Sequence, residues 1–154
     1  MKGPIDLWER VYRFMWTREQ NVPREPFAPQ IPSDNVVRQR CRWQLEETLE
    51  LIEACYPDSV AEVRSVAARL QCLIAEHAID VDLVAYADAN ADIRYVAYGN
   101  DIAAGIDGRE TDKEVALSND TKGQPDPTSG KITKGEGYRA PDIAGVLEDL
   151  GWRR

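Results

Sequence analysis

The stretch Glu46-Glu47-Thr48-Leu49-Glu50-Leu51-Ile52-Glu53 decides how the rest of this chain is interpreted. Leu45, Leu49 and Ile52 recur at i, i+4 and i+7, which predicts a helix with one apolar face. Half of the stretch is acidic and none of it is basic, and Arg42 is the only base at a spacing that allows a local ion pair. Because crowded like charges cost stability, we expect something outside the helix to neutralise them, and a divalent cation is the simplest candidate.

The overall composition is that of one globular domain, residues 1–154, with a formal charge of −8 and a pI near 4.7. This acidity argues against sequence-independent binding to nucleic acid or to anionic membranes. An anionic ligand would therefore need a metal ion to bridge it to the chain.

Cysteine and histidine usage narrows the chemistry further. The only histidine is His77, which excludes a histidine-rich metal centre and is expected to cap or pack at the end of a helix. No phosphate-binding loop of the GxxxxGK[ST] type, no GxSxG elbow, no signal peptide and no long apolar run is present. The three cysteines lack CxxC spacing, so we expect small core residues in a reducing, cytoplasmic compartment: Cys41, Cys55 and Cys72.

Helical periodicity dominates the chain and predicts an all-α bundle, with a core of about four helices and a loop-rich C-terminal tail. A proline-rich strap, 21–33, is expected to lie over the surface, and 118–137 is expected to be a loop or loose hairpin. Trp8, Tyr12 and Trp16 form a stripe that core packing explains, although Trp16 could also cover a nucleobase. The expected helices are 4–20, 34–56, 60–77 (mostly buried), 82–104, 111–117 and 141–150.

A second acidic pair lies on the helix expected at 82–104. Asp88 and Asp92 stand at i and i+4 with Tyr95 on the same face, and again no base has the spacing to pair with them. If the two acidic helices pack together, their carboxylates converge and select a hard cation such as Mg²⁺ or Mn²⁺. Such a centre predicts phosphoanhydride hydrolysis, and the alternative is that each pair sits on a solvated helix face.

These motifs resemble the MazG-like, all-α nucleoside triphosphate pyrophosphohydrolases, a family related to phosphoribosyl-ATP pyrophosphohydrolase and dimeric dUTPase. Over roughly residues 10–148 the resemblance is to short phage and bacterial forms. The matching segments are Glu46-Glu47-x-x-Glu50 (EExxE), Asp88-Ala-Asn-Ala-Asp92-Ile-Arg-Tyr95-Val, Tyr98-Gly, Gly105-Ile-Asp107, Ser118-Asn119-x-x-Lys122 and Lys134-Gly135-x-Gly-Tyr138-x-x-Pro141-Asp142-Ile143.

The chain departs from the family pattern at the second acidic helix. Ala85 and Ala89 stand three residues before Asp88 and Asp92, so the usual ExxD becomes DxxxD. Asp88 could take over the role of the missing glutamate, and the number of metal ions held there is left open.

The resemblance implies a metal-dependent enzyme that cleaves a nucleoside triphosphate between its α and β phosphates, giving the monophosphate and pyrophosphate. It implies a homodimer or homotetramer and a role in nucleotide-pool control, and purine deoxynucleotides (dGTP or dATP) are the preferred expectation. The implied Mg²⁺ or Mn²⁺ ligands are Glu46, Glu47, Glu50, Asp88 and Asp92, with Glu47 and Glu50 as the catalytic candidates. Which carboxylate orients the attacking water is left open, and Glu47 is the preferred choice. The expected substrate-binding residues are Asn119, Lys122, Lys134, Tyr138, Arg139, Trp16, Trp43 and Tyr95.

Two other functions fit the same residues. A non-catalytic acidic module that binds nucleotide or protein is favoured by Ala85 and Ala89, and would show binding without turnover. A hydrolase of the same fold could instead be restricted to one metabolite such as phosphoribosyl-ATP.

Overall fold

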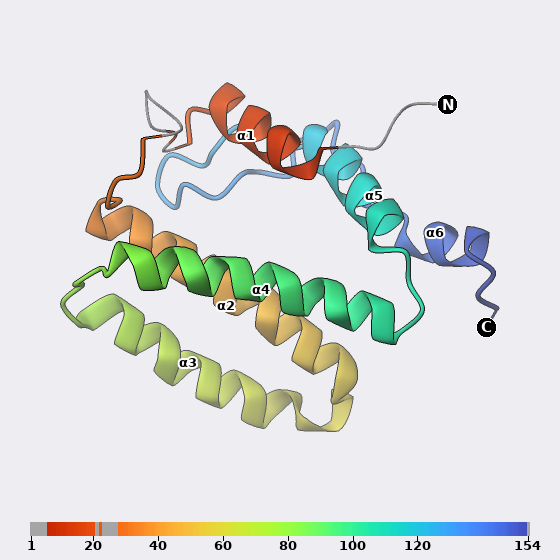
Figure 1. Ribbon diagram of the computed structural model, residues 1–154, viewed down its shortest axis with the longest axis horizontal. Helices are drawn as coiled ribbons and strands as arrows, with labels where there is room; N and C mark the ends of the chain where they lie inside the picture. Colours follow the sequence, from red (N-terminus) through yellow and green to blue (C-terminus); the bar gives the residue numbers. More distant parts are fainter. Residues whose placement is uncertain (1–5, 21, 23–27, 154) are drawn as a thin grey trace. The chain divides into compact units, whose positions relative to one another are not determined.

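The computed structural model describes residues 6–20, 22 and 28–153, and over these residues the protein is all-α, as predicted (Figure 1). The described part contains no strand, only an isolated antiparallel bridge between Pro125 and Ile132. Its contacts form two compact units, one of residues 29–86 and one of residues 1–28 with 87–154, and the single-domain organisation stays a prediction. The elements are α1 (Leu7–Thr17), α2 (Asp34–Cys55), the 3₁₀ turn η1 (Pro57–Ser59), α3 (Val60–Glu76), α4 (Leu83–Ala103), α5 (Gly108–Asp120) and α6 (Ile143–Asp149).

Capping residues fix where several of these helices begin. Asp6 accepts a hydrogen bond from the Glu9 N–H at 3.1 Å and starts α1, while residues 4 and 5, like 21 and 23–27 of the expected strap, lie outside the described part. The side chain of Asp107 accepts from the Arg109 N–H at 3.1 Å, so α5 begins at Gly108 and runs through Asp120. The expected helix 111–117 was therefore too short.

In the unit of residues 29–86, α2 and α3 form a helical hairpin across the turn at η1. Arg64 donates two hydrogen bonds to Glu53, at 2.8 and 3.0 Å, near this turn. At the other end Arg38 donates to the carbonyls of Ile74, Ala75 and His77. These carbonyls end α3, and a cation stabilises them. The His77 N–H bonds the Leu73 carbonyl at 3.2 Å, which confirms His77 as a capping residue.

This hairpin buries little. Val37 and Ala67 are its buried apolar residues among those described, whereas Val66 and Leu73 on α3 are exposed. The expectation that α3 is mostly buried was wrong, because within this unit only α2 packs along its length. The expectation of core cysteines was also wrong, since all three are exposed on α2 and α3: Cys41, Cys55 and Cys72.

In the other unit α5 is the central element, and α1 and α6 each pack against it. Ala116 and Ser118 of α5 are buried. Trp8 and Trp16 each stack on Tyr12 along α1, yet they are 57% and 55% exposed, so their expected place in a core was wrong. Within this unit none of α1, α5 and α6 packs along α4.

Among the described residues, no helix is long and apolar enough to cross a membrane.

Candidate functional site

The acidic strip of α2 is only partly neutralised. Glu53 is bound by Arg64, and this hydrogen bond holds the pKa of Glu53 below its usual range. Glu46 is half-buried, while Glu47 and Glu50 are exposed. Neither Glu47 nor Glu50 has a side-chain partner among the described residues. The predicted imbalance therefore persists at two carboxylates whose charge the fold leaves available.

The acidic pair of α4 lies in regular helix. Asp88 and Asp92 are exposed, and neither makes a side-chain hydrogen bond or ion pair with any described residue. Tyr95 is 80% exposed on the same helix. Four-residue spacing places the two aspartates on one face, so both carboxylates can approach a ligand from the same side.

Carboxylate oxygens without a competing arginine suit a hard divalent cation. The donors of each pair, Glu47 with Glu50 on α2 and Asp88 with Asp92 on α4, are therefore chemically suited to Mg²⁺ or Mn²⁺. Among the residues that the structure describes, no group of three or more His, Cys, Asp or Glu side chains is arranged to hold a metal ion. The α2 acids belong to one unit and the α4 acids to the other.

Two of the predicted substrate-binding residues lie where α5 ends. Asn119 is in the last helical turn, and Lys122 comes two residues after the helix ends at Asp120; both are half-buried. Neither side chain has a partner among the described residues. Lys134 is exposed, and its ammonium lies 5.2 Å from the centre of the Tyr138 ring. An amide and two ammonium groups are thus free to bind an anion.

The two predicted tryptophans lie in different surroundings. Trp16 stacks on Tyr12, with ring centres 6.2 Å apart, at the end of α1. Trp43 on α2 is half-buried, with the Arg40 guanidinium 5.0 Å above its ring. Trp16 therefore presents the more open aromatic face, and the role of either ring in base binding stays a prediction.

Residues 123–133 form the expected hairpin. The Gly123 N–H bonds the Thr133 carbonyl at 2.9 Å, and the Asp126 N–H bonds the Lys131 carbonyl at the same distance. Arg18, at the end of α1, donates to the carbonyls of Gly123 at 3.0 Å and Lys122 at 2.8 Å, which fixes the start of the hairpin. Sequence reasoning missed Arg18, because its acceptors are backbone oxygens far along the chain, which leave no side-chain pattern.

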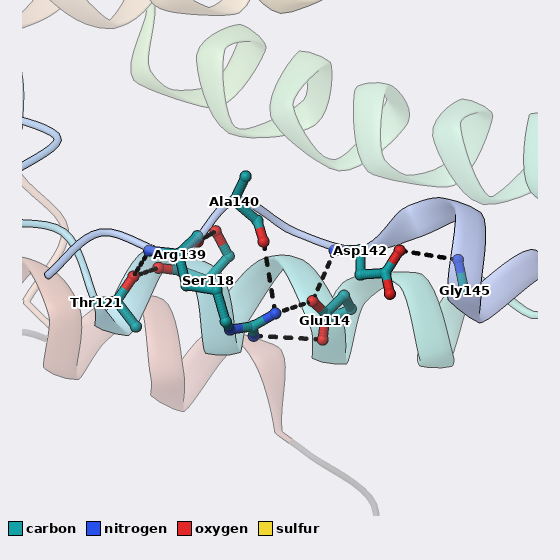
Figure 2. Close-up of polar contacts among 7 residues, drawn as sticks. All are labelled: Glu114, Ser118, Thr121, Arg139, Ala140, Asp142 and Gly145. Carbon is teal, nitrogen blue, oxygen red and sulfur yellow. Dashed lines mark hydrogen bonds and ion pairs between the residues drawn. The ribbon is translucent and has the colours of Figure 1, made fainter.

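The chain returns from this hairpin onto one face of α5, as Figure 2 shows. Both terminal nitrogens of Arg139 bind the Glu114 carboxylate, which also accepts from the Asp142 N–H at 2.8 Å. Ser118 donates to the Arg139 carbonyl at 2.7 Å, and the Arg139 N–H donates to the Thr121 hydroxyl at 2.9 Å. The Arg139 guanidinium, predicted to bind substrate, is thus already held by Glu114.

The same contacts set the electrostatics of this return. Hydrogen bonds from Arg139, and then from the Asp142 N–H, lower the pKa of Glu114, and Glu114 in turn raises the pKa of Arg139. Sequence reasoning did not assign Glu114 or Thr121 a role. Their signal was the i, i+4, i+7 spacing of Glu114, Ser118 and Thr121, a polar stripe on one helix face.

Comparison with known proteins identifies the family. A family model described as phosphoribosyl-ATP pyrophosphohydrolase matches residues 8–119, well over half of the chain. No curated protein and no solved structure matches the chain. The match includes both acidic pairs and ends at Asn119, which confirms the predicted relation to the MazG-like pyrophosphohydrolases. The chain therefore belongs to the phosphoribosyl-ATP pyrophosphohydrolase family and is an enzyme that hydrolyses a nucleotide pyrophosphate bond.

Proposed function

We propose that this enzyme is a metal-dependent nucleoside triphosphate pyrophosphohydrolase that cleaves between the α and β phosphates. The observation that carries the proposal is that Glu47, Glu50, Asp88 and Asp92 lack a side-chain partner among the described residues and fall inside the family match at 8–119. Glu47 and Glu50 belong to the EExxE motif, and Asp88 and Asp92 lie on the second acidic helix. The products are the nucleoside monophosphate and pyrophosphate.

The chain's carboxylates have two roles in this proposal. A bound Mg²⁺ or Mn²⁺ would neutralise phosphate charge and make a water molecule more acidic. Glu47 orients the attacking water and accepts its proton, with Glu50 beside it on the same helix. The water oxygen forms a bond to the α-phosphorus, and the bond from that phosphorus to the bridging oxygen breaks as pyrophosphate leaves. The proposed metal ligands are Glu46, Glu47, Glu50, Asp88 and Asp92.

The substrate is held from the end of α5 onward. The Asn119 amide hydrogen-bonds the sugar or a phosphate, and the ammonium groups of Lys122 and Lys134 meet the phosphate charge. Aromatic faces at Trp16, Trp43 and Tyr95 cover the base, with Tyr138 below Lys134. Large open rings of this kind fit a purine, so a purine deoxynucleotide such as dGTP or dATP, in nucleotide-pool control of a phage or bacterium, is the proposed preference.

A second candidate substrate is phosphoribosyl-ATP, which the description of the matching family favours. Cleavage at the same phosphoanhydride would release pyrophosphate and leave phosphoribosyl-AMP. The carboxylate chemistry is identical, so substrate choice separates the two candidates.

A substrate panel tests both. The common ribo- and deoxyribonucleoside triphosphates and phosphoribosyl-ATP are each incubated with Mg²⁺ or Mn²⁺, and the products are separated by anion-exchange chromatography. We expect monophosphate and pyrophosphate, fastest from dGTP or dATP. Intact substrates throughout, with nucleotide binding retained, would instead support a non-catalytic binding module. Diphosphate with inorganic phosphate would contradict cleavage at the α–β bond.

We also propose that the enzyme assembles as a homodimer or homotetramer. Large apolar side chains are exposed on α4, where Val84 is 80% and Ile102 77% exposed. Exposed apolar surface of this kind is typical of residues that contact another chain. Light scattering coupled to size-exclusion chromatography should give a mass two or four times 17.3 kDa, and a monomer at micromolar concentration would contradict the proposal.

A further inference from the structure

The segment from Thr121 to Asp142 lies beyond the family match at 8–119, and the motifs within it assign no role to the contacts that hold it against α5. It leaves α5, forms the hairpin at 123–133 and returns to α5. Its two ends are fixed in different ways, at the start by Arg18 and at the return by Glu114.

The hairpin brings two lysines to its open end. Lys122 and Lys134 directly flank Gly123 and Thr133, whose backbones are hydrogen-bonded to each other at 2.9 Å. A Cβ on Gly123 would lie 2.7 Å from the Thr133 hydroxyl oxygen, so the Thr133 side chain would have to shift. Gly123 therefore leaves room for the Thr133 side chain, and the two lysines occupy neighbouring positions on the paired segments of the hairpin.

Neighbouring like charges on paired strands repel each other. No described carboxylate forms an ion pair with Lys122 or Lys134, so the positive charge of these two side chains is not neutralised within the described part of the chain. The Tyr138 ring, 5.2 Å from the Lys134 ammonium, orients that side chain but adds no negative charge. The pair is suited to an anion with several phosphate oxygens.

Glu114 determines where the segment that carries Lys134 returns to α5. Its carboxylate, only 15% exposed, holds the Arg139 guanidinium and the Asp142 N–H together. It thus fixes both a side chain and the backbone of the returning segment against α5. Ser118 and Thr121 add one hydrogen bond each to the Arg139 backbone.

We propose that Glu114 is a positioning residue, which holds the return of the chain so that Lys122 and Lys134 bind the phosphates of the nucleotide as a pair. This inference rests on the proposed function for the identity of the ligand. Glu114 itself does not contact the nucleotide, since its oxygens are already taken by Arg139 and Asp142.

Calorimetric binding of an α,β-methylene deoxynucleoside triphosphate with Mg²⁺ tests the inference without requiring turnover. We expect Glu114→Gln to weaken binding by about tenfold, as Lys122→Gln does, and to speed amide hydrogen exchange at residues 139–142. The double variant should bind no more weakly than Lys122→Gln alone, because both changes disable one lysine pair. Arg139→Lys, which keeps the charge and loses the paired contact, should fall between wild type and Glu114→Gln.

The matched control is Arg64→Gln, which breaks a similar two-bond arginine–glutamate pair in the other unit. It should bind the nucleotide like the wild type. Wild-type affinity in Glu114→Gln despite faster exchange at 139–142, or additive losses in the double variant, would overturn the inference, as would failure of the wild type to bind the analogue. Wild-type binding without hydrolysis of any natural triphosphate would overturn only the proposed function, and the affinities would still decide the role of Glu114.

Discussion

Two kinds of carboxylate in this molecule differ in what the fold places beside them. Glu53 and Glu114 each receive an arginine side chain from another part of the chain, Arg64 in one case and Arg139 in the other. Four acids of the proposed metal site receive none from the described residues: Glu47, Glu50, Asp88 and Asp92. All of them lie within 8–119, so the family match alone does not separate them.

Where Glu53 and Glu114 bind an arginine, the pair joins two segments of the same unit. An acid that links two segments is neutralised within the fold, whereas a ligand of a cation has to stay available until the cation arrives. We therefore expect catalysis to need the four acids of the proposed metal site that have no arginine partner, and not Glu53.

The largest effect should come from removing the divalent cation. If the acids without partners bind a metal, a chelator should reduce pyrophosphate release to the background rate, and Mg²⁺ or Mn²⁺ should restore it. Calorimetry should also show that Mg²⁺ raises the Tm of the wild type, because a ligand of the native state stabilises it. Unchanged activity in excess chelator would mean that these acids serve another purpose.

Next in size are single substitutions of the acids. Glu50→Gln and Asp92→Asn should each lower the rate of hydrolysis by roughly 100-fold or more, because an amide carries no charge for the cation. Circular dichroism should show the same helix content as in the wild type. Glu53→Gln is the matched control, since it removes the same charge from the same helix at an acid that already has a partner. A rate loss in Glu53→Gln equal to that in Glu50→Gln would contradict the expectation that only the acids without an arginine partner are needed for catalysis.

A smaller, pH-dependent effect is expected at Glu114. Its pKa is lower in the folded protein than in the unfolded chain, chiefly because of the hydrogen bonds from Arg139. The unfolded state therefore binds more protons between the two values, so the stabilisation is present above the unfolded value and is lost as the pH falls through the folded one. The Tm difference between wild type and Glu114→Gln should be full at pH 7 and shrink below about pH 4. A gap that stays constant down to low pH would show that the contact does not depend on the charge of Glu114.

The sequence was sufficient for features that depend on local chemistry. Ser33-Asp34 and Pro57 bracket α2 within a residue of its observed ends. Ser33 takes the extended backbone of an N-cap residue without a side-chain capping hydrogen bond, and Pro57 begins the 3₁₀ turn that follows α2. The start of α5 was missed because Gly105 to Gly108 was interpreted as a helix stop only. The Asp107 side chain caps a new helix, α5, whose first residue is Gly108.

Features that depend on distant residues could not be predicted in this way. The partner of Arg18 lies about a hundred residues further along the chain, and that of Glu114 lies 25 residues away, so no local spacing reveals either. The amphipathic pattern of α1 shows which side chains are apolar but not what covers them, and Trp8 and Trp16 proved exposed. The acidic motifs were recognisable because their signal is the absence of a nearby base, which spacing does report.

The smallest predicted effect concerns Asp112, which lies two residues from Glu114 on α5. The pKa of Asp112 is raised, whereas that of Glu114 is lowered. Burial raises the pKa of Asp112, against the hydrogen bond from the Tyr98 hydroxyl at 3.2 Å, and the nearby Asp101 adds to the rise. The folded state therefore binds more protons than the unfolded state, and stability falls as the pH rises from the unfolded value through the folded one. At pH 7 this destabilisation is complete.

Asp112→Asn removes the charge and keeps an oxygen that can accept the Tyr98 hydrogen bond. The Tm at pH 7 should rise by about 1–3 °C, and the gain should be lost at about pH 3, below the pKa of an aspartate in the unfolded chain. Differential scanning calorimetry at both pH values measures this, with Glu114→Gln as the matched variant whose Tm should fall at pH 7. If both variants shift the Tm in the same direction at pH 7, an arginine partner is not what distinguishes the acids of this helix, and the comparison loses its physical basis there.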